Sequence, residues 1–366
     1  MESFTMKLLW LNANPNPNPG GTELHSIDFI NNIEKYYPDI ILYKAVAKGS
    51  FVDKNTSDKN KYYITLKSEF SPINTIKLIS LAKKLNPDFI VGNNGNEYIN
   101  TFLAGKVSRA KIILFRHMLN YQPFFNKKFI LPNVDKIFAV SQASKQRLLK
   151  DGIPQEKIVV LPNFIDEEKF YYNPIEKEEI RKKLNITSEE KVITFIGKVN
   201  RGKGVFDYVE VCKKLNESFG NLRFLIIGDG TDFNQVVEKF KEYGLYEKLI
   251  TTGNTTQPHK YLKASDVVMV LSKGEESFGR TVVEGFAVKS LVVVYDVENL
   301  KYLVEDYKSG LIAKKDNVDE VVDKVKNVLS DKELYQKITQ NAYNEFLEKY
   351  TKEKVLSKFV NELKRV

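Results

Sequence analysis

Two glutamates, Glu276 and Glu284, lie in the segment LSKGEESFGRTVVEGFA (271–287), which joins an apolar run to an expected helix beginning near Gly279 or Arg280. Backbone N–H groups at a helix start have no partner within the helix, so they suit a phosphate. A carboxylate one turn further along would repel that phosphate. We therefore expect Glu284 to bind neutral hydroxyls such as those of a ribose, and Glu276 to bind sugar hydroxyls. Both glutamates also fit a simpler interpretation, as solvated residues that the helix dipole favours.

Two lysines flank a turn in the segment FIGKVNRGKGVFDYV (195–209). An apolar run ends there in glycine, and Lys198 and Lys203 precede the next expected helix. A cation 4 Å from a phosphate contributes about 4 kcal/mol at an effective dielectric near 20. The pair would therefore lower the cost of a departing diphosphate. A lone lysine in such a turn more often faces solvent, so this motif alone leaves both interpretations open.

Glycines mark two further places where apolar runs end. Gly20 and Gly21, in NPGGTE (18–23), would let the backbone come close to a ligand or adopt a positive φ. The segment IGDG (227–230) is expected to be a turn.

Histidine and cysteine are scarce, with three histidines and one cysteine in the chain. His117 ends an apolar run, where a ligand site would lie. His25, on the first expected helix, and His259, in a polar loop, are expected to be structural. The lone Cys212 permits no internal disulfide. No HxH, HExxH or carboxylate cluster has the spacing of metal ligands, and GxSxG does not occur, so we expect neither a tightly bound metal nor a serine nucleophile.

Short apolar runs rich in Val and Ile recur along the 366 residues, each followed by a longer amphipathic or polar stretch. This alternation is typical of parallel strands joined by helices, and such runs suit strands covered on both faces. We therefore predict an α/β fold of two Rossmann-like, doubly wound domains facing each other across a cleft. The expected strands lie within 7–12, 39–46, 88–93, 111–117, 136–141 and 157–163, and within 191–197, 222–230, 249–254, 266–272 and 291–296.

The break between the domains is expected after LPNFID, where an acidic and aromatic stretch precedes the next strand. We predict an N-terminal domain over 1–165, a linker over 166–184 and a C-terminal domain over 185–345. The last residues, 346–366, have helical spacing of apolar residues and are expected to form a closing helix that packs back on the first domain.

Composition indicates a globular protein, with 42% hydrophobic and 28% charged residues. The apolar run at 8–11 is too short for a secretory signal, and no run reaches the roughly 20 apolar residues of a membrane span. We therefore expect a cytoplasmic protein.

Most of the net charge of +9 is concentrated in residues 101–150, which hold ten Lys or Arg against one acid. Within them, Phe124, Phe125 and Phe129 are interleaved with Lys127 and Lys128. This pattern suits an anionic membrane surface, such as the inner face of a plasma membrane, or a phosphorylated acceptor. A solvated surface is the alternative. No nucleic-acid-binding module is recognisable, so we expect no nucleic acid partner.

Taken together, these segments resemble the retaining GT-B glycosyltransferases of family 4 (glycosyl transferases group 1). The loop GGTE (20–23) is similar to that family's loop after the first strand, and residues 136–166 to its approach to the second domain. GKVNRGKG (197–204) resembles its diphosphate motif, and ESFGRTVVEGFA (276–287) its pair of glutamates. The resemblance covers nearly the whole chain, in the same order and with the same spacing.

The resemblance implies an acceptor-binding first domain and a second domain that binds a UDP- or GDP-sugar, with no tightly bound cofactor. By it, Lys198 and Lys203 would hold the donor diphosphate. Glu276 would bind the sugar hydroxyls, Glu284 the ribose, and His117 would lie near the transferred sugar. The wider donor set would be Gly20, Gly21, Ser277, Phe278, Gly279, Arg280 and Thr281, and the residues expected to meet the acceptor or a membrane are Glu23, Arg116, Phe124, Phe125, Lys127 and Lys128.

The sequence departs from the family pattern at two places. Lys198 stands where the family usually has Arg, which keeps the charge and loses the bidentate fork. Lys289 and Leu291 stand where Gly and Pro are usual, which affects the turn before the next strand.

The implied reaction is metal-independent hexosyl transfer with retention, in which the departing phosphate oxygen takes the acceptor's proton. The acceptor would be a glycan or lipid-linked molecule of polysaccharide, lipopolysaccharide or glycolipid synthesis. Two alternatives remain open. A sugar-nucleotide epimerase of the same shape would need acid and base groups on both faces of the sugar, and a non-catalytic module would only bind nucleotide or glycan.

Overall fold

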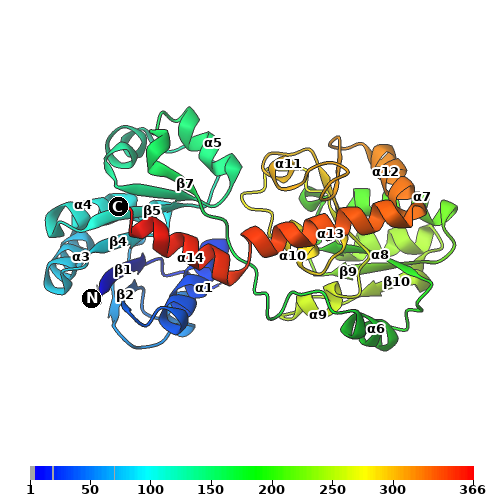
Figure 1. The fold of residues 1–366 in the computed structure, drawn as a ribbon, viewed down its shortest axis with the longest axis horizontal. Helices are drawn as coiled ribbons and strands as arrows, with labels where there is room; N and C mark the ends of the chain where they lie inside the picture. Colours follow the sequence, from blue (N-terminus) through cyan, green and yellow to red (C-terminus); the bar gives the residue numbers. More distant parts are fainter. Residues whose placement is uncertain (1–4, 19, 70) are drawn as a thin grey trace. The chain divides into compact units, whose positions relative to one another are not determined.

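The chain divides into two units, of which the computed structural model describes residues 5–18, 20–69 and 71–366. Unit 1 runs to Asn163 and resumes at Val355, within the last helix, so most of that helix and the C-terminal end of the chain belong to it. Unit 2 comprises Phe164–Lys354. Figure 1 shows the elements of both units, coloured along the chain.

Unit 1 is built on seven parallel strands in the order β3-β2-β1-β4-β5-β6-β7. The order reverses between β1 and β4, and ligands of such sheets bind at the carboxyl ends of the strands beside the reversal. The strands are β1 (Met6–Asn12), β2 (Ile40–Val46), β3 (Lys61–Tyr63), β4 (Phe89–Gly92), β5 (Lys111–Arg116), β6 (Lys136–Ala139) and β7 (Ile158–Val160), and the α-helices are α1 (Gly21–Tyr36), α2 (Phe51–Lys54), α3 (Pro72–Leu85), α4 (Tyr98–Ser108), α5 (Gln142–Lys150) and α14 (Lys352–Leu363).

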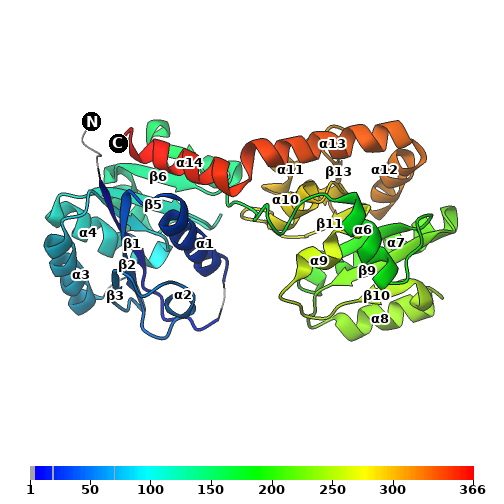
Figure 2. The same cartoon turned by 60° about the horizontal axis from the view of Figure 1, so that its bottom comes forward.

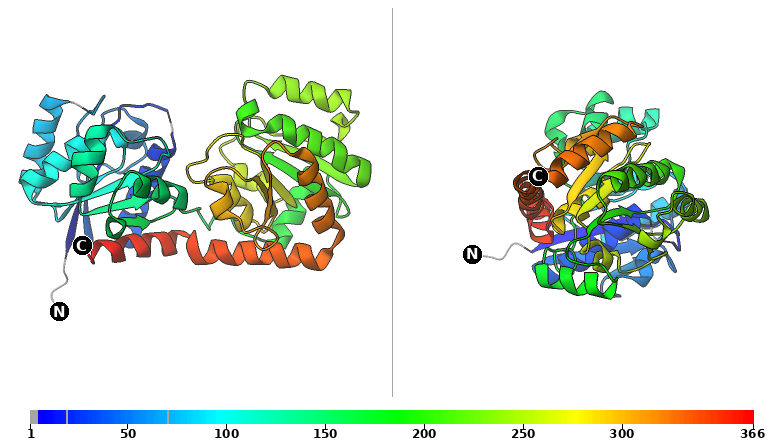
Figure 3. Two further views of the ribbon diagram at one scale, coloured as in Figure 1. Left: turned by 90° about the horizontal axis from the view of Figure 1, so that it is seen from above. Right: turned by 90° about the vertical axis from the view of Figure 1, so that its right-hand side faces the viewer.

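Successive residues of β1 pack against different helices, because side chains alternate across a strand. Leu9 and Leu11 belong to a buried cluster that includes residues of α3, α4 and α5. The ring of Trp10 lies 5.7 Å from that of Phe29 in α1 and 6.1 Å from that of Phe359 in α14. Helices therefore cover both faces, with α3 and α4 on one side of β1 and α1 on the other (Figures 1 and 2). The C-terminus lies beside the start of β1 (Figure 3).

Unit 2 has six parallel strands in the order β10-β9-β8-β11-β12-β13, with the reversal between β8 and β11. The strands are β8 (Lys191–Ile196), β9 (Leu222–Ile227), β10 (Leu249–Thr251), β11 (Val267–Val270), β12 (Leu291–Tyr295) and β13 (Leu311–Ala313), and the α-helices are α6 (Pro174–Lys183), α7 (Val205–Ser218), α8 (Phe233–Glu242), α9 (Pro258–Leu262), α10 (Arg280–Ala287), α11 (Leu300–Leu303), α12 (Val318–Ser330) and α13 (Lys332–Lys349).

Helix α6 is tied to the sheet of unit 2 by a buried ionic cluster. Asp266, which precedes β11, forms ion pairs with Arg181 and, at 2.9 Å, with Lys177. Its Oδ2 also accepts a hydrogen bond from the N–H of Val192 at 2.8 Å. Part of the stretch 166–184, expected to be a linker, is therefore a helix bonded to this unit.

The turn between α10 and β12 has the hydrogen bonds of a Schellman motif. Ser290 N donates to Gly285 O at 3.0 Å, and Lys289 N donates to Phe286 O at 3.0 Å. Lys289 has φ +58°, in the left-handed region where glycine is favoured. Lys289, which stands where the family that the sequence resembles has glycine, thus keeps the glycine conformation.

Each of the eleven expected strands is present, while β3 and β13 were not predicted from the sequence. Both additional strands are three residues long and lie at sheet edges, as β7 and β10 do. They were missed because β3 (KYY) contains no Val, Ile or Leu, and β13 (LIA) lies between a glycine and two lysines. His259 was expected in a polar loop, and this prediction is wrong. It lies in α9, whose first turn begins with Pro258, a residue favoured at a helix start.

Candidate functional site

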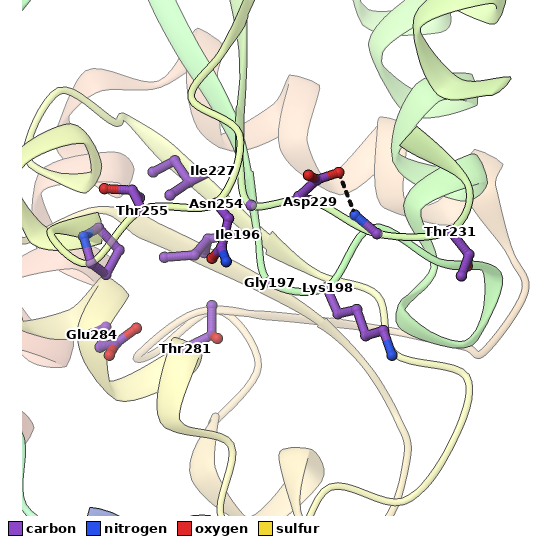
Figure 4. Close-up of a pocket in the computed structure, with 13 residues that line it drawn as sticks. Ile196, Gly197, Lys198, Ile227, Asp229, Thr231, Asn254, Thr255, Thr281 and Glu284 are labelled. Carbon is purple, nitrogen blue, oxygen red and sulfur yellow. Dashed lines mark hydrogen bonds between the residues drawn. The ribbon is translucent and has the colours of Figure 1, made fainter. Parts of the chain in front are cut away.

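A cavity of about 840 Å³ opens at the carboxyl ends of β8 and β9 in unit 2 (Figure 4). Its walls come from the loops after three neighbouring strands and from the first turns of α10. In the view of Figure 4, Thr281 lies between Glu284 and Lys198. The lining residues are Ile196, Gly197, Lys198, Ile227, Gly228, Asp229, Gly230, Thr231, Asn254, Thr255, Pro258, Thr281 and Glu284.

Glycines let the loops after β8 and β9 touch each other. Gly228 has φ +136°, and a Cβ placed on it would lie 2.0 Å from the carbonyl oxygen of Gly197. A Cβ on Gly230 would lie 2.2 Å from the carbonyl oxygen of Val199. Both contacts are too close for any other residue, so the wall of the cavity is backbone at Gly228 and Gly230, with the side chain of Asp229 between them. The interpretation of 227–230 as a plain turn missed that the segment lines the cavity.

Lys198 lines the cavity, and its ammonium forms no ion pair with another residue of the described ranges. Lys203 behaves differently. It ends a 3₁₀ turn at Arg201–Lys203, and its Nζ forms an ion pair with Oε1 of Glu276. The same oxygen accepts a hydrogen bond of 2.6 Å from Ser272 Oγ. The structure thus brings together Lys203, predicted for phosphate, and Glu276, predicted for sugar hydroxyls, in one cluster.

Glu284 is a buried carboxylate in the wall of the cavity. Arg280, one turn earlier on α10, donates from Nε to its Oε1 at 2.9 Å. Burial raises the pKa of Glu284 above its ordinary value, and the Arg280 charge works in the opposite direction. The carboxylate is held in a fixed direction, where it can accept hydrogen bonds from hydroxyls.

Helix α10 begins where the sequence predicted, with Gly279 as its N-cap and Arg280 as its first residue. Gly279 has φ +80°, and an added Cβ would lie 2.6 Å from Leu303 Cδ1. Phe278 is buried, and its carbonyl oxygen accepts a hydrogen bond of 2.7 Å from Asn299 Nδ2. Within the predicted stretch 277–281, Thr281 is the residue that lines the cavity.

In unit 1, the glycine pair forms the start of α1. Gly20 is the N-cap in extended conformation, with φ −113°, and Gly21 is the first helical residue. The alternative that these glycines adopt a positive φ is wrong. Open space surrounds a Cβ placed on Gly21, which leaves room for a ligand at the helix start. Glu23 is buried there and accepts hydrogen bonds from Thr22 Oγ1 at 3.0 Å and Asn14 Nδ2 at 3.2 Å.

His117 and His25 share one hydrogen-bond acceptor. Asn93 Oδ1 lies 3.0 Å from His117 Nε2 and 2.9 Å from His25 Nδ1, and Asn93 Nδ2 donates to Thr22 O at 2.9 Å. Burial lowers the pKa of His117 to about 3, with a smaller contribution from the Arg116 charge. Burial also holds the pKa of His25 well below its ordinary value. At neutral pH His117 is therefore uncharged, donates from Nε2 to Asn93 and carries its lone pair on Nδ1.

Glu97 was not singled out from the sequence, yet it joins the ends of two strands. Its Oε1 accepts from Ala13 N at 2.6 Å and its Oε2 from Asn94 N at 3.0 Å. Burial raises the pKa of Glu97 to about 8, against the opposing effect of these backbone N–H groups. In the sequence, the position of Glu97 soon after an apolar run places it at the edge where ligands bind, but it does not indicate that the side chain is buried.

The residues predicted for the acceptor or a membrane fall into two groups. Glu23 and Arg116 are buried at the carboxyl edge of the unit 1 sheet. Phe124 and Phe125 are exposed, and Lys127 forms an ion pair of 3.1 Å with Asp151. Lys128 is exposed in the same π-helical turn, Asn126–Ile130.

Within the part of the chain that the structure describes, no three His, Cys, Asp or Glu side chains are grouped so that they could hold a metal ion. The same residues contain no helix with the length and apolar character needed to cross a bilayer.

Two family matches cover the two units. Residues 176–345 match the family described as Glycosyl transferases group 1, and residues 20–169 match Glycosyltransferase Family 4. The chain belongs to the group 1 glycosyltransferases of GT-B fold. The predicted fold class and the family resemblance are both confirmed.

Individual proteins agree with this assignment. The chain is 22% identical over 362 residues to N-acetyl-alpha-D-glucosaminyl L-malate synthase of Bacillus anthracis, covering 93% of this chain and 91% of that protein. The crystal structure of Anabaena HepE in complex with UDP matches with a TM-score of 0.84 at 17% identity, over 99% of this chain and 100% of that one. A glycosyltransferase of Rickettsia africae matches with a TM-score of 0.85 at 22% identity, over 99% and 98%.

Proposed function

We propose that this glycosyltransferase is a retaining hexosyltransferase that takes its sugar from a UDP- or GDP-sugar and needs no metal. The observation that carries the proposal is the cavity at the ends of β8 and β9, which combines a lysine, a buried glutamate and the backbone of Gly228 and Gly230. Anabaena HepE has been crystallised with UDP and with UDP-glucose, which favours a UDP-sugar as the first donor to test.

The proposed donor contacts follow from the chemistry of the cavity wall. Lys198 would neutralise the diphosphate beside the start of α10. Glu284 would accept hydrogen bonds from the ribose hydroxyls. Lys203 and Glu276 would act as a pair, in which the diphosphate competes for the ammonium and the sugar hydroxyls for the carboxylate.

Retention is proposed because the reaction needs no enzyme nucleophile when the departing phosphate takes the acceptor's proton. Positioning and stabilisation of the diphosphate then supply the rate. His117, uncharged and with Nδ1 free to accept, would bind a hydroxyl and would not donate a proton.

For the acceptor we propose a glycan or lipid-linked molecule bound by unit 1. The name of the Bacillus anthracis relative adds L-malate, a small hydroxy acid, to the acceptors worth testing. Phe124, Phe125 and Phe129 are 71%, 51% and 52% exposed, which supports contact of this segment with an anionic membrane. Sedimentation with phosphatidylglycerol vesicles at low salt tests that contact, and protein left in the supernatant would refute it.

The donor proposal is tested by incubating the protein with UDP-glucose or GDP-glucose and following the products by NMR. We expect slow hydrolysis that releases α-glucose before mutarotation and persists in EDTA. Lys198→Ala should reduce it at least tenfold, whereas Lys241→Ala, which removes an exposed charge from α8, should not. Release of β-glucose would contradict retention, an epimerised donor would favour the epimerase, and loss in EDTA would contradict metal independence.

A further inference from the structure

Arg116, at the end of β5, is a buried cation without an acidic partner. The residue is 4% exposed, and its guanidinium forms no ion pair with any acidic side chain in residues 5–18, 20–69 and 71–366. A charge taken out of water is costly unless it is paired or fully hydrogen-bonded. The position of Arg116 therefore calls for a compensating group.

The groups that do contact Arg116 are neutral. Asn120 accepts from Nη2 through its backbone carbonyl and, at 3.0 Å, through Oδ1. In the amide orientation that satisfies both of its side-chain atoms, Gln122 also accepts from Nη2 at 3.0 Å. These contacts fold the loop 118–123 around the guanidinium, but they bring no negative charge.

A pocket of about 250 Å³ lies beside this guanidinium in unit 1, and two of its lining residues carry buried N–H donors without an acceptor in the described chain. These donors are Nε of Arg116 and Nδ2 of Asn94. Thr22 and Asn96 also line the pocket. An unsatisfied buried donor costs about as much as a lost hydrogen bond, so two on residues that line one pocket favour a ligand rich in acceptors.

The acidic residue among those that line the pocket is Glu69. It is half-buried, and its Oε1 accepts a hydrogen bond of 3.4 Å from Asn126 Nδ2. It forms no ion pair with Arg116, and no other acid lines this pocket in the described part of unit 1. Two charged side chains therefore line the pocket, the buried guanidinium of Arg116 and the half-buried carboxylate of Glu69, and the guanidinium is the one that would attract an anion. His117, also in the lining, is neutral at physiological pH.

We propose that this pocket binds an anionic group, a carboxylate or a phosphate, on the sugar acceptor, with Arg116 and Asn94 as its donors. The inference rests on the proposed function, in which unit 1 binds the acceptor. A planar guanidinium matches the oxygens of either anion, and an anion bound beside it would compensate the buried charge. The chain would then select acidic acceptors over neutral ones.

The test is isothermal titration, in buffer free of phosphate, with glucose 6-phosphate, glucuronate and glucose. These probes share one ring and differ in the anion, so they separate phosphate from carboxylate. At least one acidic probe should bind ten times more tightly than glucose. Equal affinity of all three would overturn the proposal.

Two variants and one control test whether the preference for an acidic probe arises in the pocket beside Arg116. Arg116→Gln should remove the preference for the acidic probe. Because Arg116 also holds the loop 118–123, Asn94→Asp provides a second variant, which keeps the oxygen that caps the turn at Gly95–Glu97 and replaces the orphan donor by an acceptor. Asn94→Asp should weaken the binding of the acidic probe at least tenfold. Arg109→Gln, an exposed arginine at the end of α4, removes the same charge and should leave the preference intact.

Titration of UDP into the same proteins separates the two proposals. Retained UDP binding without any anion preference would refute the acceptor pocket alone. An anion preference that survives both Arg116→Gln and Asn94→Asp would also refute it, since the probe would then bind elsewhere. Absence of UDP binding in the wild type would refute the donor site instead.

Discussion

Replacing Glu284 by Gln separates a ligand contact from the packing of α10. The side chain is buried, and burial raises the pKa of its carboxyl, so the charged form is held at a cost. Gln keeps the shape and can still accept from Arg280 Nε. The free energy of unfolding should therefore change by less than about 1 kcal/mol.

The effect on UDP affinity should be larger. Hydrogen bonds to a charged acceptor contribute about 1.5–3 kcal/mol, and those between neutral groups about 0.5–1.5 kcal/mol. Each ribose hydroxyl that donates to Glu284 should therefore lose about 1–1.5 kcal/mol of binding free energy in Glu284→Gln, or about 2–3 kcal/mol for both hydroxyls. This corresponds to a dissociation constant roughly 30 to 160 times weaker.

Isothermal titration with UDP and with 2′-deoxy-UDP measures this contact. The wild type should discriminate between the two nucleotides, and Glu284→Gln should discriminate much less, because the two changes remove the same interaction. Glu242→Gln, at the exposed end of α8, is the matched control. Unchanged UDP affinity in Glu284→Gln, with normal thermal unfolding, would refute the ribose contact.

Three further predictions concern stability. The free energy of unfolding should be about 1 kcal/mol greater for Lys289→Gly than for Lys289→Ala, because φ is +58° at this position and strains any residue other than glycine. Calorimetry should show an unfolding temperature roughly 2–4 °C higher for the glycine variant, and equal stability of the two variants would contradict the strain. The pKa of His117 is about 3 in the folded protein and about 6.5 in the unfolded chain. Between these two pH values the unfolded state binds one more proton, so the free energy of unfolding falls as the pH falls, by about 1.4 kcal/mol per pH unit. The unfolding temperature should therefore drop more steeply from pH 6.5 to 4.5 in the wild type than in His117→Asn, and parallel curves would count against a His117 that stays neutral in the folded protein. Gly228→Ala should lower the unfolding temperature by several degrees, because its Cβ would lie 2.0 Å from a carbonyl oxygen, and an unchanged transition would show that the two loops can separate.

The fold was predictable because long, fully buried strands leave continuous apolar runs in a sequence. Such runs mark β1 or β12 without reference to any other element. The edge strands β3 and β13 leave no such mark, since β3 (KYY) has no aliphatic residue and β13 (LIA) is bounded by glycine and lysine. Their pairing depends on neighbours far away in the sequence.

The candidate site was only partly predictable. Lys198 and Glu284 stand in motifs whose residue types indicate their chemistry, and both line the cavity. The ion pair between Lys203 and Glu276 could not be foreseen, because the two residues belong to loops that follow different strands. Glu97 was missed because its role depends on the N–H groups of another loop, and a lone glutamate near a strand end gives no sign of burial.

The central claim is that the cavity in unit 2 holds the nucleotide diphosphate of the donor. Amide hydrogen exchange with and without saturating UDP tests it most directly. The account predicts slower exchange in 197–204, in 228–231 and at the start of α10, with smaller changes elsewhere in unit 2. Unchanged exchange in all three segments, under conditions where titration confirms that UDP is bound, would contradict it.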